Sequence, residues 1–560
     1  MKSIKIIFPL FAGIFISVLS VDGQPTYKHW DQRFGGSKDD SPSTIQSTSD
    51  GGFLIGGTSI SGVSGDKTQP NWDPGLVGSD FWVLRTDSNG VKLWDKRFGG
   101  VNSEILVRML TTNDGGFILA GHSFSGVSGD KTQPNWDPTQ QSYDYWVVKV
   151  SANGLKQWDK RFGGNSLELL GGIAATNDGG YVIAGSSFSG ISGDKSQASQ
   201  GSWDYWVVRI DSLGNKLWDK RFGGTDDDFA TAVVVDSNGH LLIGGYSQSL
   251  AGGDKSQFCQ GQWDYWIVKT DLNGSKIWDK TFGGNYTDWL FDLTTTSDGG
   301  YVLAGQSFSE NTGDKSEPNH DPTPSSSDRW ILKVDQAGTK LWDRTIGGTE
   351  TEDLRRISEL PDGGFLISGE SYSPISGNKT EDNLGVEQTW VVKTDSVGIP
   401  VWDKTIFSNG HDEEGSAIGL PNGCIVSVNY TLADTGGYKS QLSRGDGDYW
   451  LVKLCNAPLG TGISDLGPSW PTIDVFPNPC QDYLNISWPT MMDEQSMITY
   501  TITDLVGKKM GIPINHPIGH TQHTIDTKML SNGIYLLNIE VRTENQTQNI
   551  AKKFTVVGLK

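Results

Sequence analysis

The chain has 560 residues, only four of them cysteines, and a formal net charge of −21 at pH 7. This acidity argues against a nucleic-acid-binding protein, because binding to phosphates needs clustered Lys and Arg side chains. The few cysteines exclude a disulfide-rich scaffold, and the sequence has no Cys-x-x-Cys spacing typical of a metal site.

The first 23 residues have the pattern of a secretory signal peptide. Lys2 and Lys5 precede an apolar run from Ile6 to Leu19, and small and polar residues follow through Gly23. The run is shorter than the ~20 residues that a membrane helix needs, and no later stretch is apolar enough to span a membrane. We therefore expect export of a mature chain that has no transmembrane segment.

Residues 24–455 contain seven copies of one repeat. Each copy has four short segments rich in Val, Ile, Tyr and Trp, called a, b, c and d here; in the third copy they are residues 167–176, 181–187, 204–210 and 216–222. Asp-Gly and Asn-Gly turns separate a from b and c from d. Four antiparallel strands repeated seven times predict an all-β chain with a seven-bladed β-propeller. Segment d carries a Trp-Asp pair that starts at Trp30, Trp94, Trp158, Trp218, Trp278, Trp342 and Trp402.

The two ends of the repeat region favour a closed ring over an open solenoid. After the seventh copy the chain runs through a segment c at residues 449–454 but has no Trp-Asp segment behind it, whereas an orphan Trp-Asp segment stands at residues 27–34. We expect this N-terminal strand to complete the last blade. A solenoid would need polar caps at both ends, and none is present in the sequence. The period of 60 or 64 residues also excludes the WD-repeat family, whose period is ~40 to 45 residues.

One face of the ring collects the b–c and d–a connections, because strand direction alternates within a blade. An acid ends each d–a connection. Seven acids near the channel mouth predict a candidate rim for a ligand or for Ca²⁺, which prefers carboxylate and carbonyl oxygens. The alternative is that each acid accepts backbone N–H bonds inside its own blade. The acids are Asp40, Glu104, Glu168, Asp228, Asp288, Glu352 and Asp412.

The long b–c loops supply further candidate contacts. Most repeat Gly-Asp-Lys, and the first two also contain Asn-Trp-Asp-Pro. A Trp between Asn and Asp offers a flat face for a sugar ring, and a packed loop anchor is the competing interpretation. The candidate loop residues are Asp66, Asp130, Asp194, Asp254, Asp314, Trp72 and Trp136.

The sequence contains no recognisable catalytic constellation. The propeller histidines occupy unrelated positions of the repeat, which argues against a His-based site, and a nucleophile with a base is absent. We therefore favour binding or adhesion, with a glycan or a surface protein as the ligand, over catalysis. The alternative is a carbohydrate-active enzyme, a glycosidase or lyase, that uses channel-facing carboxylates.

Two cysteines fall on neighbouring strands of the seventh blade. Cys424 opens segment b and Cys455 ends segment c. Because these strands are antiparallel neighbours, the Cα atoms can lie within disulfide range, and we predict a disulfide between the two cysteines.

The repeat stops at Cys455, and residues 456–472 form a linker rich in Gly, Pro and Ser. Residues 473–560 contain Asp-Val-Phe-Pro-Asn-Pro from Asp474, Leu-Ser-Asn-Gly-Ile-Tyr-Leu from Leu530, and a closing Lys-Lys-Phe-Thr-Val-Val from Lys552. This segment resembles the type A C-terminal sorting domain of type IX secretion cargo. The resemblance implies a small immunoglobulin-like β-sandwich that the type IX secretion machinery recognises and a Bacteroidota-type source. It also implies export through the periplasm to the outer cell surface or the medium.

Overall fold

A computed structural model describes residues 24, 27–73, 75, 77–139, 141–321, 323 and 325–456, followed by the tail segments 474–476, 482–487, 497–504, 508–510, 514–517, 522–542 and 547–556. The expected signal peptide at residues 1–23 and all but the first residue of the linker lie outside these residues. The chain divides into two compact units with the boundary after Leu459.

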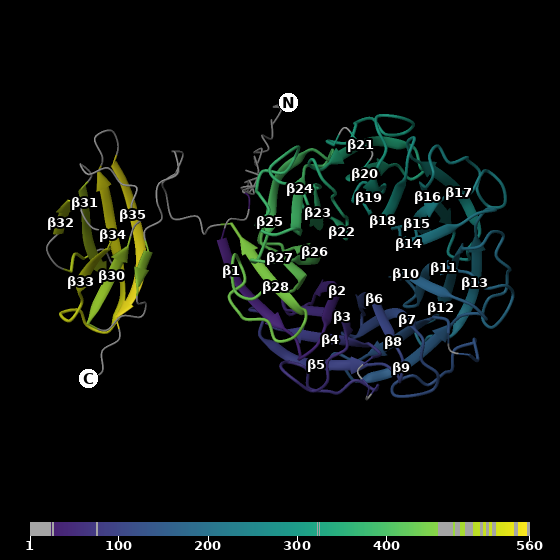
Figure 1. The fold of residues 1–560 in the computed structure, drawn as a ribbon, viewed down its shortest axis with the longest axis horizontal. Coiled ribbons are helices and arrows are strands. Elements are labelled where there is room, and N and C mark those ends of the chain that lie inside the picture. The colour runs from purple at the N-terminus through teal and green to yellow at the C-terminus, as the bar shows by residue number, and fades with distance from the viewer. Residues whose placement is uncertain are drawn as a thin grey trace, which may run out of the picture. The chain divides into compact units, whose positions relative to one another are not determined.

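The first unit is a seven-bladed β-propeller of four-stranded antiparallel sheets (Figure 1). In each blade, strand a lies innermost and strand d outermost. The first three blades contain β2 (Asp40–Ser47), β3 (Phe53–Ser59), β4 (Asp80–Thr86) and β5 (Lys92–Phe98); β6 (Glu104–Thr111), β7 (Phe117–Ser123), β8 (Asp144–Val150) and β9 (Lys156–Phe162); and β10 (Glu168–Ala175), β11 (Tyr181–Ser187), β12 (Asp204–Ile210) and β13 (Lys216–Phe222).

Blades four to six follow the same order. They contain β14 (Asp228–Val235), β15 (Leu241–Ser247), β16 (Asp264–Thr270) and β17 (Lys276–Phe282); β18 (Asp288–Thr295), β19 (Tyr301–Ser307), β20 (Asp328–Val334) and β21 (Lys340–Ile346); and β22 (Arg356–Glu359), β23 (Phe365–Ser371), β24 (Gln388–Thr394) and β25 (Pro400–Ile406).

The seventh blade joins both ends of the repeat region. It consists of β26 (Asp412–Gly419), β27 (Ile425–Thr431), β28 (Asp448–Cys455) and, as its outer strand, β1 (Tyr27–Phe34). β1 pairs antiparallel with β28, from Tyr27 opposite Cys455 to Phe34 opposite Tyr449. The expected closure by the N-terminal strand is therefore present.

The Trp-Asp repeat is explained by one hydrogen bond in every blade. The strand-d aspartate accepts the indole N–H of the fully buried strand-c tryptophan; Trp82 donates to Asp95 at 3.2 Å. In the seventh blade the same bond joins Trp450 to Asp31 of β1 at 3.3 Å. A buried indole N–H without a partner costs free energy, so every blade needs this aspartate, and the last blade takes it from the N-terminus.

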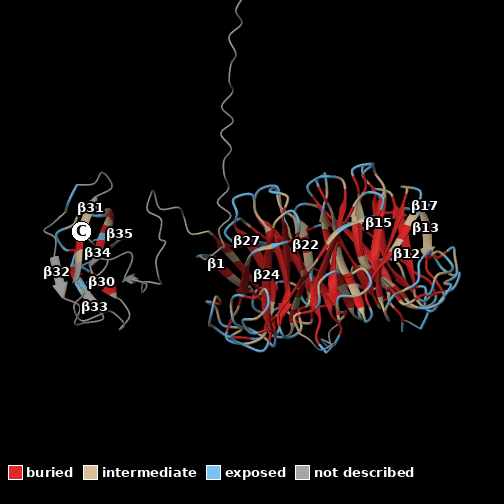
Figure 2. Cartoon of the chain, turned by 90° about the horizontal axis from the view of Figure 1, so that it is seen from above, coloured by how far each residue is buried: buried red, intermediate tan, exposed pale blue. Residues whose placement is uncertain are grey.

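Apolar side chains of adjacent blades form the core. Phe81 and Val83 of the first blade pack with Leu106, Leu119 and Trp146 of the second. Figure 2 shows the strands buried and the connecting loops exposed. The tight a–b and c–d turns use glycines with positive φ, such as Gly115 at 76° and Gly154 at 72°, a region that other residues avoid.

Cys424 and Cys455 form a disulfide with their Cα atoms 4.1 Å apart. Cys424 immediately precedes β27, and Cys455 ends β28. The covalent link therefore joins two neighbouring strands of the blade that closes the ring.

The second unit contains two antiparallel sheets around one core. One sheet has the order β29-β30-β33 and the other β32-β31-β34-β35. Leu484 and Ile525 from the first sheet share a buried cluster with Tyr500, Leu537 and Val556 from the second, which makes the unit a small β-sandwich. The strands are β29 (Asp474–Phe476), β30 (Tyr483–Ser487), β31 (Met497–Asp504), β32 (Ile514–Pro517), β33 (Gln522–Asp526), β34 (Gly533–Arg542) and β35 (Thr547–Val556). Within the described residues no helix is long and apolar enough to cross a membrane.

Candidate functional site

The seven acids that end the d–a connections lie inside the blades. Glu104, for example, accepts hydrogen bonds from the Gly100 N–H at 2.7 Å and from the Ser123 hydroxyl at 2.6 Å. These bonds tie the d–a turn to the end of strand b. This structural role explains why an acid recurs here, and no bound ligand is needed to explain it. The carboxylates do not form an exposed rim, because each residue is 0% exposed: Asp40, Glu104, Glu168, Asp228, Asp288, Glu352 and Asp412.

The loop aspartates and the two loop tryptophans connect neighbouring blades. Asp130 of the second blade accepts bonds from the Arg97 guanidinium at 2.7 Å and from the Trp72 indole at 2.9 Å, both in the first blade. The guanidinium also lies over the Trp72 ring, 4.5 Å from its centroid. Trp136, Arg161 and Asp194 repeat this arrangement between the second and third blades. Asp66 and Asp254 bind arginines of the preceding blade, and Asp314 accepts a bond from Gln260.

A second set of buried acids begins strand c. Asp80 accepts the Trp72 N–H at 2.9 Å and is 1% exposed. Burial and the nearby Glu104 carboxylate raise the pKa of Asp80 to about 7. Burial also lowers the pKa of Lys67, the lysine of the Gly-Asp-Lys repeat, to about 8. These repeated charges therefore form an internal framework of the blade edge.

The residues at the channel mouth on the long-loop face change type from blade to blade, whereas the buried charged residues of the framework recur. A pocket of about 280 Å³ lies here. Its walls come from residues two to five of the inner strands of blades two to five and from the ends of β11 and β15. Leu354 and Arg355, just before β22, complete them. Residues at the same place in successive blades therefore surround one opening.

Phe229, Tyr246 and Phe291 line this pocket, and further rings of blades three to five pack around them. Trp203 lies 5.3 Å from Phe229, which lies 5.5 Å from Tyr246, and Tyr246 lies 5.3 Å from Trp263, measured between ring centroids. Most of these rings are partly exposed, and Phe188 is 47% exposed. We call this set the aromatic arc: Phe188, Trp203, Phe229, Tyr246, Trp263, Trp289, Phe291 and Phe308.

Several carboxylates of blades six and seven occupy positions that are aromatic in blade four. Glu387 precedes its strand c as Trp203 and Trp263 precede theirs, and Glu370 is the sixth residue of β23 as Tyr246 is of β15. Arg355 pairs with Glu370 at 3.1 Å, and the Ser41 hydroxyl donates to Glu414 at 2.7 Å. Glu414 has a φ of 56° and is the only residue other than glycine with positive φ in the part of the chain that the structure describes. We call this set the acidic arc: Asp353, Glu370, Glu387, Glu413 and Glu414.

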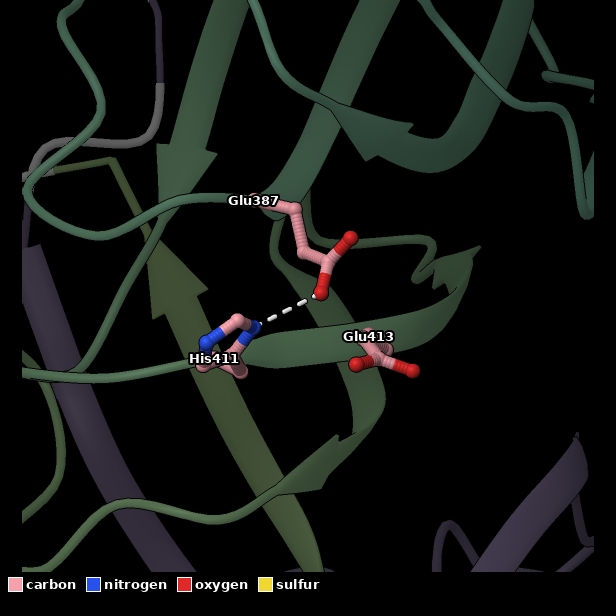
Figure 3. A group of neighbouring side chains, drawn as sticks. All are labelled: Glu387, His411 and Glu413. Carbon is pink, nitrogen blue, oxygen red and sulfur yellow. Dashed lines mark hydrogen bonds and ion pairs between the residues drawn. The ribbon is translucent and has the colours of Figure 1, made fainter.

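Three side chains of this region form a compact cluster, Glu387, His411 and Glu413 (Figure 3). His411 Nδ1 lies 2.8 Å from Glu387 Oε1. Burial and the Glu387 carboxylate raise the pKa of Glu413 to about 7. Although burial acts in the other direction, hydrogen bonds from Tyr372 and His411 hold the pKa of Glu387 below its usual value. The pKa of Glu387 is therefore lowered and that of the neighbouring Glu413 is raised.

Charged side chains cross the channel below the mouth. Arg108 of the second blade lies 3.7 Å from Asp292 of the fifth, and Arg356 of the sixth donates to the Ile45 carbonyl of the first at 2.6 Å. Arg108 lines both the mouth pocket and a second cavity of about 240 Å³ in the middle of the channel. The mouth pocket therefore has a polar floor.

The residues of the two arcs were not predicted from the sequence, because the predicted site residues were mainly those that recur in the repeat. The recurrent acids and tryptophans support the blades, whereas the arcs occupy positions whose residue type changes between copies. His411 followed by Asp-Glu-Glu, and Glu387 before Gln388, are departures from the repeat that are visible in the sequence. Only the packing of blade seven against blade six brings His411 and Glu387 into contact.

Comparison with known proteins identifies the tail. Residues 474–554 match the secretion system C-terminal sorting domain, so the chain carries a type IX sorting domain behind its propeller. The chain is 27% identical over 432 residues to the regulatory protein FlaEY of Caulobacter vibrioides, covering 69% of this chain but only 44% of that protein. Among solved structures, PorZ, a surface component of the type IX secretion system of Porphyromonas gingivalis, aligns over 92% of this chain and 74% of its own, with 10% identity and a TM-score of 0.34. A puromycin hydrolase aligns over 81% and 59%, with 11% identity and a TM-score of 0.41.

Proposed function

We propose that this type IX secretion cargo is a binding protein of the outer cell surface or the medium, and that its ligand site is the channel mouth between the aromatic and acidic arcs. The sorting domain indicates export across the outer membrane. The observation that carries the proposal is the contrast within the repeat. The residue that follows the recurrent buried acid is aromatic in blades four and five (Phe229, Trp289) and acidic in blades six and seven (Asp353, Glu413), whereas the acid before it stays buried in every blade.

A glycan fits the chemistry of this mouth. Tyr and Trp rings offer flat apolar faces together with polar edges, and carboxylates accept hydrogen bonds from hydroxyl groups. The pocket of about 280 Å³ is close to the ~300 Å³ at which small-molecule sites begin, which suits a terminal sugar of a longer chain. A protein ligand would have to insert a side chain into the same opening.

The test is a glycan array with the mature chain from Gln24, followed by titration of the best ligand. Trp263→Ala removes a ring of the aromatic arc, and Trp72→Ala is the matched control, because Trp72 is a partly exposed loop tryptophan outside the mouth. Loss of a central aromatic contact costs about 2 kcal/mol, so we expect about 30-fold weaker binding for Trp263→Ala and unchanged binding for Trp72→Ala. Equal losses in both variants would move the site to the loops, and a silent array would refute a glycan ligand.

The carboxyl pair supports a second candidate, a carbohydrate-active enzyme. Glu387 and Glu413 have pKa values displaced in opposite directions, a pattern typical of an acid and its partner in glycoside hydrolysis. Release of reducing sugar from a bound glycan would favour this enzymatic function over glycan binding alone. Glu413→Gln should then abolish release while leaving binding intact, whereas a pure binder releases nothing at all.

A further inference from the structure

We propose that Glu387, His411 and Glu413 form a binding site for a single zinc-type divalent cation at the channel mouth. One ligand atom from each side chain lies within 4.8 Å of the other two. The three come from two blades, since Glu387 precedes β24 of blade six and the other two lie at the start of blade seven (Figure 3). The proposal adds a metal to the mouth and does not depend on the identity of its ligand.

The distances suit one ion. Zn²⁺ binds a His nitrogen at about 2.0–2.1 Å and a carboxylate oxygen at about 2.0–2.2 Å, so two of its ligand atoms lie at most about 4.3 Å apart. Atoms already within 4.8 Å need only small side-chain rotations to surround such an ion. Both segments are held together by the backbone, because the Asp412 N–H donates to the Glu387 carbonyl at 3.4 Å across the two blades.

The charge around the cluster favours a cation. Glu370, Glu414 and Asp353 stand in the same arc, and Arg355 pairs with Glu370 rather than with the cluster. Glu387 and Glu413 are close enough to repel each other when both are ionised. A divalent ion between them replaces this repulsion with attraction.

The ligand types select the class of ion. Imidazole suits Zn²⁺ and its neighbours among the transition metals, whereas Ca²⁺ takes six to eight oxygen ligands. His nitrogen and Glu oxygen are both zinc ligands, and a site with three protein ligands keeps a further position for water or a bound molecule, as open zinc sites do. The expected ion therefore differs from the Ca²⁺ considered for the buried acids.

The experiment is calorimetric titration of Zn²⁺ into the untagged mature chain after chelator treatment, in the absence of any glycan. We expect one ion per chain with a dissociation constant in the micromolar range or below. Loss of a group that only orients a metal ligand already costs about 10- to 100-fold in affinity, so His411→Ala and Glu413→Gln should each weaken binding by at least about tenfold.

His240→Ala is the matched control, because it removes a histidine from an a–b turn on the opposite face of the ring. It should leave zinc affinity unchanged. Circular dichroism and the melting temperature verify that each variant is folded, and Co²⁺ provides a second measurement through its absorption spectrum at the same site. Absent zinc binding, or binding that survives both His411→Ala and Glu413→Gln, overturns the proposal while leaving the glycan test unaffected.

Discussion

The blade framework and the channel mouth are built from the same repeat but follow opposite rules. In the framework, an acid such as Glu104 keeps its residue class in every copy because it satisfies buried N–H and hydroxyl donors. At the mouth, a position such as that of Trp263 and Glu387 changes from aromatic to acidic around the ring. The difference indicates that residues which recur in every copy are those a blade needs to fold. Residues that change between copies at the shared opening are those the ring presents to a ligand.

The largest stability effect should come from the disulfide in the closing blade. Cys424 and Cys455 are separated by 31 residues, and loop-closure entropy then gives about 3–4 kcal/mol of stabilisation. We expect the double variant Cys424→Ser, Cys455→Ser to lose this amount in denaturant unfolding. Reducing agent should lower the stability of the wild type to the level of the variant and leave the variant unchanged. A wild type insensitive to reduction would contradict the prediction.

A smaller loss should follow from removing the framework aspartate that closes the ring. Asp31 accepts bonds from the Trp450 indole and from the Ser440 N–H. Asp31→Ala leaves the buried Trp450 indole N–H without this partner and removes the bond from Ser440, and we expect a loss of about 2–3 kcal/mol in the free energy of unfolding. Phe188→Ala at the mouth is the control and should change stability by less than about 0.5 kcal/mol. Equal effects of the two variants would remove the distinction between framework and mouth.

The smallest effect should be a pH dependence of the framework. Burial raises the pKa of Asp80, Asp144 and Asp288 to about 7. The folded chain therefore binds these protons more tightly than the unfolded chain, and the stability they contribute is lost as pH rises through about 7. We expect the melting temperature to be lower at pH 8 than at pH 5.5. Asp80→Asn, which imitates the amide of Gln388 in blade six, should reduce this decrease, and a rise with pH would contradict the assignment.

Much of the fold could be predicted because it rests on local patterns. Trp-Asp spacing, Asp-Gly turns and the orphan strand at residues 27–34 led to seven blades and to closure by β1, which the sheet order confirms. The tail motifs led to a sorting domain, which the match over residues 474–554 confirms. The carboxylates were harder to interpret, since the repeat alone could not distinguish an acid buried under Ser and Gly donors from one at an exposed rim.

The sequence by itself determined the blade, its number of copies, the closing strand and the sorting domain, because each depends on residues within one repeat or one short motif. Only the tertiary structure decided which positions share an opening. Glu387 and His411 are 24 residues apart, and Trp263 and Glu413 belong to different blades. Which of these residues come close depends on how the blades pack and how the ring curves, and local propensity carries no information about that.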